Sequence, residues 1–140
     1  MEIGAISDSQ INASSLYYPK DMHAATHGRR NFQETASKSG AWVAATADAN
    51  QWLQVDLGNQ FNVKRVATQG RSYSSQWPWG NHNQWVTRYK LQYSDDEVNF
   101  QYFKQQGQTA DKVKTRKCTI PLSVFKGKNT LLYKQCQQDK

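Results

Sequence analysis

Hydrophobic and polar residues alternate along four stretches of the chain. These are 51–58 (QWLQVDLG), 61–70 (FNVKRVATQG), 85–94 (WVTRYKLQYS) and 99–106 (NFQYFKQQ). A period of two places successive side chains on opposite faces of a strand, so each stretch predicts a β-strand with one apolar face. In the third stretch the alternation is strict, and we expect Trp85, Tyr89 and Leu91 to share the core face. Polar turn signals such as Gly58-Asn59 separate the strands and predict an antiparallel sandwich or barrel.

Helical patterning is weak along the whole chain. No window keeps the 3.6-residue apolar period of a helix, and the best short candidate is 19–28 (PKDMHAATHG), where Pro19 is placed to begin one or two turns. Small residues between 37 and 50 predict a loop around Trp42. With 140 residues, the chain has the size of one domain, and its class is expected to be all-β.

The net charge of +7 comes entirely from one end of the sequence. Residues 1–103 carry nine Lys/Arg and nine Asp/Glu, whereas residues 104–140 carry nine Lys/Arg against two Asp. We interpret the basic segment as a solvated end, and its alternative is an arm for phosphates, glycosaminoglycans or anionic lipid. The N-terminal MEIGAISDSQ lacks the basic start and apolar stretch of a signal peptide.

Two cysteines, Cys118 and Cys136, lie in the basic segment, and their count fits either one disulfide or two free thiols. A hairpin turning at 126–128 would place them opposite each other, which gives a hypothesis for a bridge. Asn12-Ala13-Ser14 is a glycosylation sequon that matters only if the chain is secreted.

Catalytic or metal-binding sets are sparse. His23 and His27 are spaced like two metal ligands on a helix, but no third ligand stands at a recognisable spacing, so we interpret them as solvated. The run 95–97 (DDE) reads as a turn and lacks the alternate spacing of a calcium loop. The sequence contains no phosphate-binding glycine loop and no G-x-S-x-G motif. We therefore expect no enzyme and no cofactor, and a structural calcium ion has no clear ligand set.

Aromatic residues outside the strands are the strongest candidates for binding. Trp77 and Trp79 flank Pro78 in a polar loop and are expected to be exposed. Tyr17 and Tyr18 form a second aromatic tip, although either could also be a buried strand end. Such rings suit sugars, lipid headgroups and protein partners, because each combines a flat apolar body with a polar edge.

Several of these segments together resemble one family. GAISDSQINASS, GAW, DANQWLQVDLG, VKRVATQGR and NQWVTRYKLQYSDDEVNF occur in the order found in the discoidin, or coagulation factor V/VIII type C, domain. The resemblance covers residues 4–103 and implies a galactose-binding-domain-like jelly-roll β-sandwich with projecting loops called spikes. It implies an extracellular or cell-surface binding module in a secreted or membrane-anchored protein.

The same resemblance implies a ligand site on the spikes. It places residues 15–22 on the first spike and residues 71–83 on another, with 77–82 (WPWGNH) as an extension of the second. The implied core includes Trp52, Leu53, Val55 and Leu57. The ligand-binding residues that we expect from the loops and the resemblance are Tyr17, Tyr18, Arg71, Trp77, Trp79, Asn81 and His82.

The sequence departs from the family after residue 103. We divide it into 1–103, most of a discoidin-like domain, and 104–140, a divergent basic tail that completes part of the sandwich if it folds. The family's last strands have no clear counterpart there, and its first cysteine would precede Met1, so we do not expect the family's usual disulfide.

The expected function is recognition of a galactose-like cell-surface glycan or glycoprotein in cell adhesion. Anionic phospholipid at a membrane surface is the first alternative, and collagen or a receptor protein is the second. Nucleic acid binding through the basic tail is less favoured, because residues 1–103 offer no excess of positive charge to support it.

Overall fold

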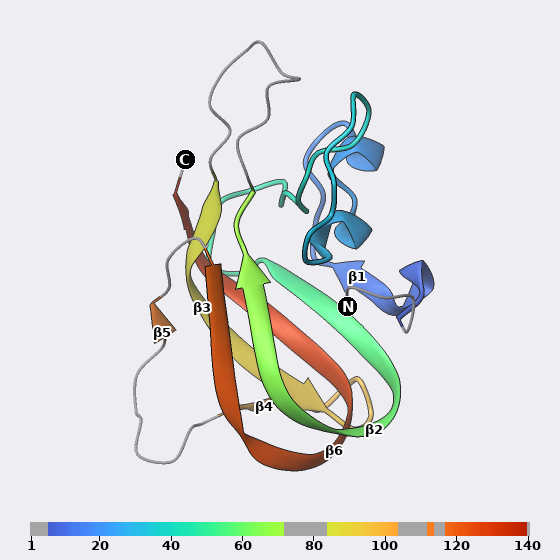
Figure 1. Cartoon of the computed structure of the whole chain (residues 1–140), viewed down its shortest axis with the longest axis vertical. Coiled ribbons are helices and arrows are strands. Elements are labelled where there is room, and N and C mark those ends of the chain that lie inside the picture. Colours follow the sequence, from blue (N-terminus) through green and yellow to red (C-terminus); the bar gives the residue numbers. More distant parts are fainter. Residues whose placement is uncertain (1–5, 72–83, 104–111, 114–116, 140) are drawn as a thin grey trace.

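The computed structural model describes residues 6–71, 84–103, 112–113 and 117–139 (Figure 1). Its strands are β1 (Ile11–Ala13), β2 (Trp52–Gln69), β3 (Trp85–Ser94), β4 (Gln101–Tyr102), β5 (Lys112–Val113) and β6 (Lys117–Asp139). Its 3-10 helices are η1 (Asp8–Gln10), η2 (Lys20–His23) and η3 (Ala25–Gly28). Within these ranges no helix is long and apolar enough to cross a membrane.

The strands form one antiparallel sheet in the order β1-β2-β6-β3-β4, with β5 beside β3. Figure 1 shows that the long strands β2 and β6 both bend at the lower end of the molecule and return, so the sheet folds over on itself into two layers. This arrangement is an all-β, jelly-roll-like sandwich, as the sequence predicts. Helices η2 and η3 and the loops between β1 and β2 gather at the upper right of the same view, above β1.

Strand β2 is continuous where the sequence predicts a turn. The expected break at Gly58-Asn59 is wrong, because Gly58 adopts a φ of +74° and donates its N–H to the Asp56 carboxylate over 2.7 Å. Glycine reaches this left-handed conformation without strain. The pairing of β2 with β6 shifts register between Asp56 and Phe61 and at two later points. These irregularities let one strand bend between the two layers instead of ending.

Strand β6 lies in the middle of the sheet, between β2 and β3. The predicted hairpin around residues 126–128 is therefore wrong: residues 117–139 form one strand that pairs with β2 along most of its length. Cys118 lies opposite Thr68 of β2, whereas Cys136 falls in the part of β6 that pairs with β3. The two cysteines consequently do not face each other across a turn.

The apolar core follows the predicted alternation with three corrections. Leu53 and Val55 are buried with Ile11 and Ala44, and Tyr89 and Leu91 form a second cluster with Val63, Val66, Val86 and Phe103. Trp52 and Leu57, expected in the core, are only half-buried. Trp85 is also half-buried, because irregular pairing of β3 with β6 near residues 86–89 changes the phase and packs Val86 against the cluster.

Candidate functional site

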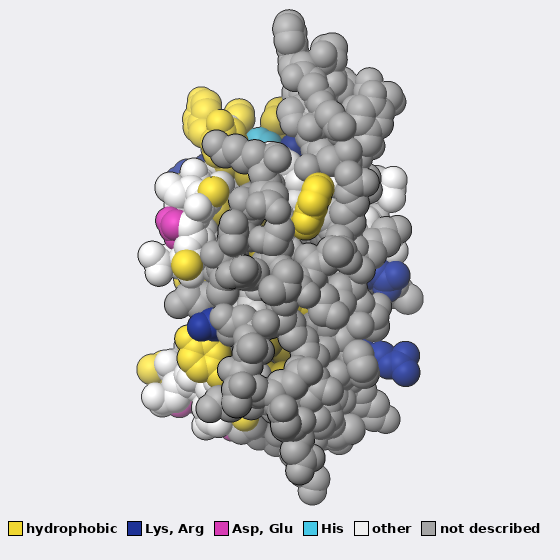
Figure 2. Space-filling view, turned by 90° about the vertical axis from the view of Figure 1, so that its left-hand side faces the viewer, with side chains coloured by type: hydrophobic (Ala, Val, Ile, Leu, Met, Phe, Trp, Pro, Cys, Tyr) yellow, Lys and Arg dark blue, Asp and Glu magenta, His cyan; other side chains and the backbone are white. Residues whose placement is uncertain are grey.

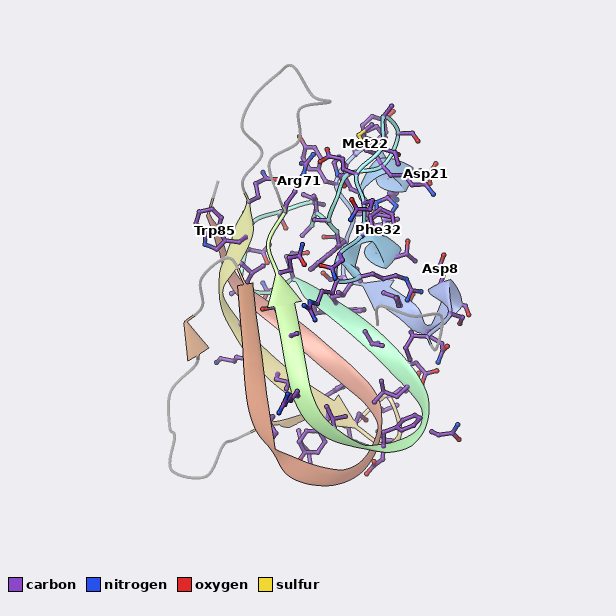
Figure 3. All side chains as sticks on the ribbon, in the orientation of Figure 1. Asp8, Asp21, Met22, Phe32, Arg71 and Trp85 are labelled. Atoms are coloured by element: carbon purple, nitrogen blue, oxygen red, sulfur yellow. The ribbon has the colours of Figure 1, made fainter. Side chains whose placement is uncertain are left out.

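One end of the sandwich carries the helices and several buried polar side chains. It is built from η2, η3, the segment 29–51 and Arg71, which follows β2, and we call it the loop end. Figure 3 shows Met22 and Arg71 at the top of the molecule, with Phe32 below them. Figure 2 shows hydrophobic side chains at this end beside a histidine and a basic side chain. The loop end therefore combines apolar surface with charge.

Arg71 and Gln84, which border residues 72–83 of the second predicted spike, lie side by side just after β2. Arg71 and Gln84 form an antiparallel bridge, and the Arg71 N–H donates to the Gln84 carbonyl over 2.8 Å. Gly70 permits this approach, because a Cβ there would lie 2.7 Å from the Cβ of Trp85. The predicted ligand residues Trp77, Trp79, Asn81 and His82 lie outside the described residues.

Arg71 forms a buried ion pair with Glu34. The two side chains are 7% and 12% exposed, and the guanidinium donates to the Glu34 carboxylate over 2.9 Å. A longer contact of 3.5 Å joins Arg71 to the Gln84 side chain. Nε of Arg71 is buried and has no hydrogen-bond partner among the described residues. Because buried charges need partners, this pair fixes the position of the strand end relative to the loop that carries Glu34.

Tyr17 and Tyr18 form an exposed aromatic tip, 52% and 82% accessible respectively. The alternative of a buried strand end is therefore wrong. The backbone of Tyr17 is held by a 2.9 Å hydrogen bond to the Val43 carbonyl, and its ring meets the His23 ring edge to face at 5.4 Å. The tip is consequently solvent-accessible but fixed at its base.

His23 supports this tip from below. Its Nδ1 lies 3.0 Å from the hydroxyl of Ser39, which is completely buried. That hydroxyl also lies 2.8 Å from the Met22 carbonyl and 2.7 Å from the Ala41 carbonyl. Since its single proton goes to a carbonyl, His23 must donate from Nδ1. The Ser39 hydroxyl is thus a structural link, and not a nucleophile activated by His23.

His27 occupies a similar buried position. Its Nδ1 donates to the Met22 carbonyl over 3.0 Å, and its ring stacks on Phe32 at 4.4 Å. The interpretation of His23 and His27 as solvated is wrong, because both are less than one-tenth exposed. They also belong to two separate 3-10 helices. No group of three potential metal ligands occurs in the described part of the chain.

Burial lowers the pKa of both histidines. For His23, the positive charge of Arg71 and then that of His27 lower the pKa further. For His27, the hydrogen bond to Met22 and the charge of Asp8 oppose the shift, while Lys38 adds to it. The neutral imidazole is therefore the form that the loop end favours.

Gln51 connects the loop of residues 37–50 to the residues after β1, a role that the sequence did not predict. Its side chain is buried and accepts hydrogen bonds from the hydroxyls of Ser14 and Ser15. Its amide nitrogen donates to Thr46 over 2.9 Å and to Asp48 over 3.0 Å. No local pattern signals the bonds to Ser14 and Ser15, because these residues lie 37 and 36 positions from Gln51 in the sequence. They hold the predicted loop around Trp42 against β1.

The opposite end of the sandwich carries the predicted acidic turn. Asp96 accepts hydrogen bonds from the backbone of Val98 and Asn99 and from the side chains of Ser94 and Asn99. These bonds, those from Asn99 being the strongest, hold the pKa of Asp96 well below its usual range. The interpretation of 95–97 as a turn is confirmed.

A two-layered β-sandwich with loops and exposed aromatic residues at one end defines a class of binding modules. The model of the F5/8 type C domain matches residues 10–124. The chain therefore belongs to the F5/8 type C, or discoidin, domain family.

Relatives and solved structures agree with this assignment. Lactadherin from Rattus norvegicus is 38% identical over 104 residues, which cover 73% of this chain and 23% of lactadherin. EGF-like repeat and discoidin I-like domain-containing protein 3 from Homo sapiens is 36% identical over 114 residues, covering 81% of this chain and 22% of that protein. The chain thus spans about a quarter of the length of these relatives.

Two solved structures show the same fold at low sequence identity. Discoidin II from Dictyostelium discoideum has a TM-score of 0.72 at 22% identity, with 93% of this chain and 49% of that chain covered. CpGH89CBM32-5 from Clostridium perfringens, solved with GalNAc-β-1,3-galactose, has a TM-score of 0.65 at 15% identity, with 96% of this chain and 86% of that chain covered.

Proposed function

We propose that this chain is an extracellular recognition module that binds a galactose-like cell-surface glycan in cell adhesion through its loop end. The carrying observation is the exposed tip of Tyr17 and Tyr18 on a base of buried polar side chains. Such a base limits the motion of Tyr17, and a binding surface that is ordered in advance loses less entropy when a ligand arrives. The fold similarity to a module solved with GalNAc-β-1,3-galactose supports a sugar as the ligand.

Within this proposal the residues have different roles. Tyr17 and Tyr18 offer ring faces against which the apolar side of a sugar packs. Arg71 is buried against Glu34, and we assign it to positioning the start of residues 72–83. Trp77, Trp79, Asn81 and His82 remain our proposed contacts from that segment.

Retention on a galactose resin, followed by a glycan array, tests the proposal. Replacing Tyr17 and Tyr18 together by Ser should remove most binding and change the melting temperature little, because the rings are 52% and 82% exposed and the main loss is the edge contact of Tyr17 with His23. Tyr102→Ser is the matched control, since Tyr102 is 47% exposed on β4 at the other end. The double replacement of Trp77 and Trp79 by Ala should also abolish retention without unfolding. Full retention by both double variants would contradict the proposal.

Anionic phospholipid is a second candidate because Lys20 is exposed directly after Tyr17, Tyr18 and Pro19. Aromatic rings that enter a membrane interface beside a lysine are a common anchoring arrangement, and each basic residue near the surface adds about 1 kcal/mol. Sedimentation with phosphatidylserine vesicles at low and high salt separates the candidates. Lipid binding should weaken with salt, whereas stacking on a neutral sugar should not.

Binding to collagen, a receptor protein or nucleic acid has less support. For nucleic acid, removal of the basic segment would not be a clean test, because β6 forms the middle of the sheet. The salt dependence of duplex binding by the intact chain is the appropriate measurement. A steep loss of affinity with salt would favour that function.

A further inference from the structure

Asn12 lies exposed on the first strand of the sheet. Burial alternates along β1, with Ile11 buried, Asn12 exposed and Ala13 half-buried. Strand β1 is at one edge of the sheet order, and Asn12 lies opposite Gln54 of β2. The Asn12 side chain therefore stands on the outer face of the β1–β2 pair, away from the side of the sheet that buries Ile11.

Asn12-Ala13-Ser14 is the only Asn-x-Ser/Thr triplet in the sequence. The fold uses its third residue and leaves its first residue free for modification. The Ser14 hydroxyl donates to the Gln51 side chain over 2.9 Å and accepts from the Trp52 backbone over 2.9 Å. Ser14 thus anchors β1, while Asn12 remains accessible. An attached glycan would consequently require no rearrangement of these contacts.

We propose that Asn12 is an N-glycosylation site. The donor is an oligosaccharide linked through pyrophosphate to a lipid carrier. Its C1–O bond breaks, a C1–N bond forms to Nδ2 of Asn12, the amide loses one proton, and the lipid pyrophosphate leaves. The proposal depends on the extracellular location in the proposed function, because the chain meets this donor only during secretion.

The neighbourhood of Asn12 suits a bulky, hydrated group. Trp52 alternates with the buried Leu53 and is half-buried, so its ring shares the outer face with Gln54. Diagonal neighbours on paired strands lie within reach of large side chains, and the first sugar can pack against the indole. Since β1 is an edge strand, a glycan here also discourages pairing with a second sheet edge. Figure 1 shows β1 below η2, so the glycan leaves the loop end accessible.

Secretion of the full chain from eukaryotic cells behind a cleavable signal peptide tests this site without a ligand assay. The secreted protein should migrate more slowly than the same protein treated with peptide:N-glycosidase. Asn12→Gln should remove the difference, and Ser14→Thr should preserve it, because threonine completes the triplet and keeps the hydroxyl. If Asn12→Gln is poorly secreted, peptide mapping of the enzyme-treated wild type should show conversion of Asn12 to an aspartate.

A secreted wild-type chain with a cooperative thermal melt, an unmodified mass and an unmodified Asn12 peptide would overturn the proposal. A mobility difference that persists in Asn12→Gln would also overturn it. Galactose retention measured before and after enzyme treatment tests a separate matter: loss of retention in both samples counts against the proposed function and leaves the assignment of Asn12 intact.

Discussion

The loop end and the sheet are held together by different kinds of interaction. In the sheet, the buried side chains are mainly apolar: Ile11, Leu53, Val55, Tyr89 and Leu91. At the loop end they are mainly polar: His23, His27, Ser39, Gln51 and Arg71. Apolar packing depends on volume and tolerates changes of pH, whereas buried polar pairs depend on each partner and on its protonation. The geometry of the surface proposed for ligand binding therefore depends more on pH and on individual side chains than the geometry of the sheet does.

Breaking the buried ion pair should have the largest effect. Arg71→Ala leaves the Glu34 carboxylate buried without its cation, which typically costs about 3–5 kcal/mol in the free energy of unfolding. The double variant Arg71→Met with Glu34→Leu should lose much less, because no charge remains buried. Urea denaturation measures both. An equal loss in the two variants would show that packing, and not charge, holds the loop end.

An exposed ion pair gives the matched control. Asp8 and Arg29 are 2.7 Å apart, but the Asp8 side chain is 76% exposed. Asp8→Ala should therefore cost only about 0–1 kcal/mol. A loss as large as that of Arg71→Ala would mean that burial does not explain the difference between the two pairs.

A cavity in the sheet should cost somewhat less than the broken buried pair. Leu91→Ala removes a buried side chain packed among Val63, Val66, Val86 and Phe103, and such truncations cost about 2–5 kcal/mol. The loss should be the same at neutral and mildly acidic pH, because none of these groups titrates. Urea denaturation at both pH values measures it. If the loss differs markedly between them, the sheet and the loop end are not energetically separate.

Mild acid should destabilise the loop end selectively. The pKa of His23 and of His27 is lowered from 6.5 in the folded state, so the unfolded chain takes up protons first as pH falls. The stabilising contribution is complete above pH 6.5 and is lost as pH falls through the folded pKa values. Thermal melts across this pH range should show that the melting temperature of the wild type falls with pH. In His23→Gln and in His27→Gln this fall should be smaller. A decline of the same steepness in both variants would assign it to other groups.

Loss of the acidic turn should occur at lower pH than loss of the histidine contribution, and it should reduce stability the least. The pKa of Asp96 is lowered from 3.8, so its contribution is present above pH 3.8 and is lost as pH falls below that value. Asp96→Ala should lower the melting temperature slightly at neutral pH, and Asp95→Ala is the neighbouring control. Because Asp96 is at the surface, a large loss would reveal a wider role for this turn.

The sequence predicted the class of the fold better than its connections. The alternation of apolar and polar residues identified the strands, and the quoted motifs identified the family, because both signals lie in short runs of consecutive residues. The continuity of β2 was missed because Gly58-Asn59 has the composition of a turn, while its φ and its bond to Asp56 allow an irregular strand. The hairpin in β6 was predicted from local symmetry, but pairing with the distant β2 prevails.

The candidate site was predicted only in part. Tyr17 and Tyr18 are exposed, as expected of a spike, since aromatic residues beside proline in a polar stretch are a local signal. Glu34 could not be predicted as the partner of Arg71, because 37 positions separate them. The burial of His23 and His27 depends on Ser39, Met22 and Phe32, which reach them only through the fold of the loop.

The order of the strands has a consequence for how the chain folds. Strand β6 is last along the sequence, yet β2 and β3 are both paired to it. During synthesis on a ribosome, β2 and β3 emerge before β6, so the edges that pair with β6 stay unpaired until β6 is made. Such non-local pairing is slow, and waiting edges are open to other chains. Apart from β6, the Gly70 and Arg71 contacts with Gln84 and Trp85 join the segments next to β2 and β3.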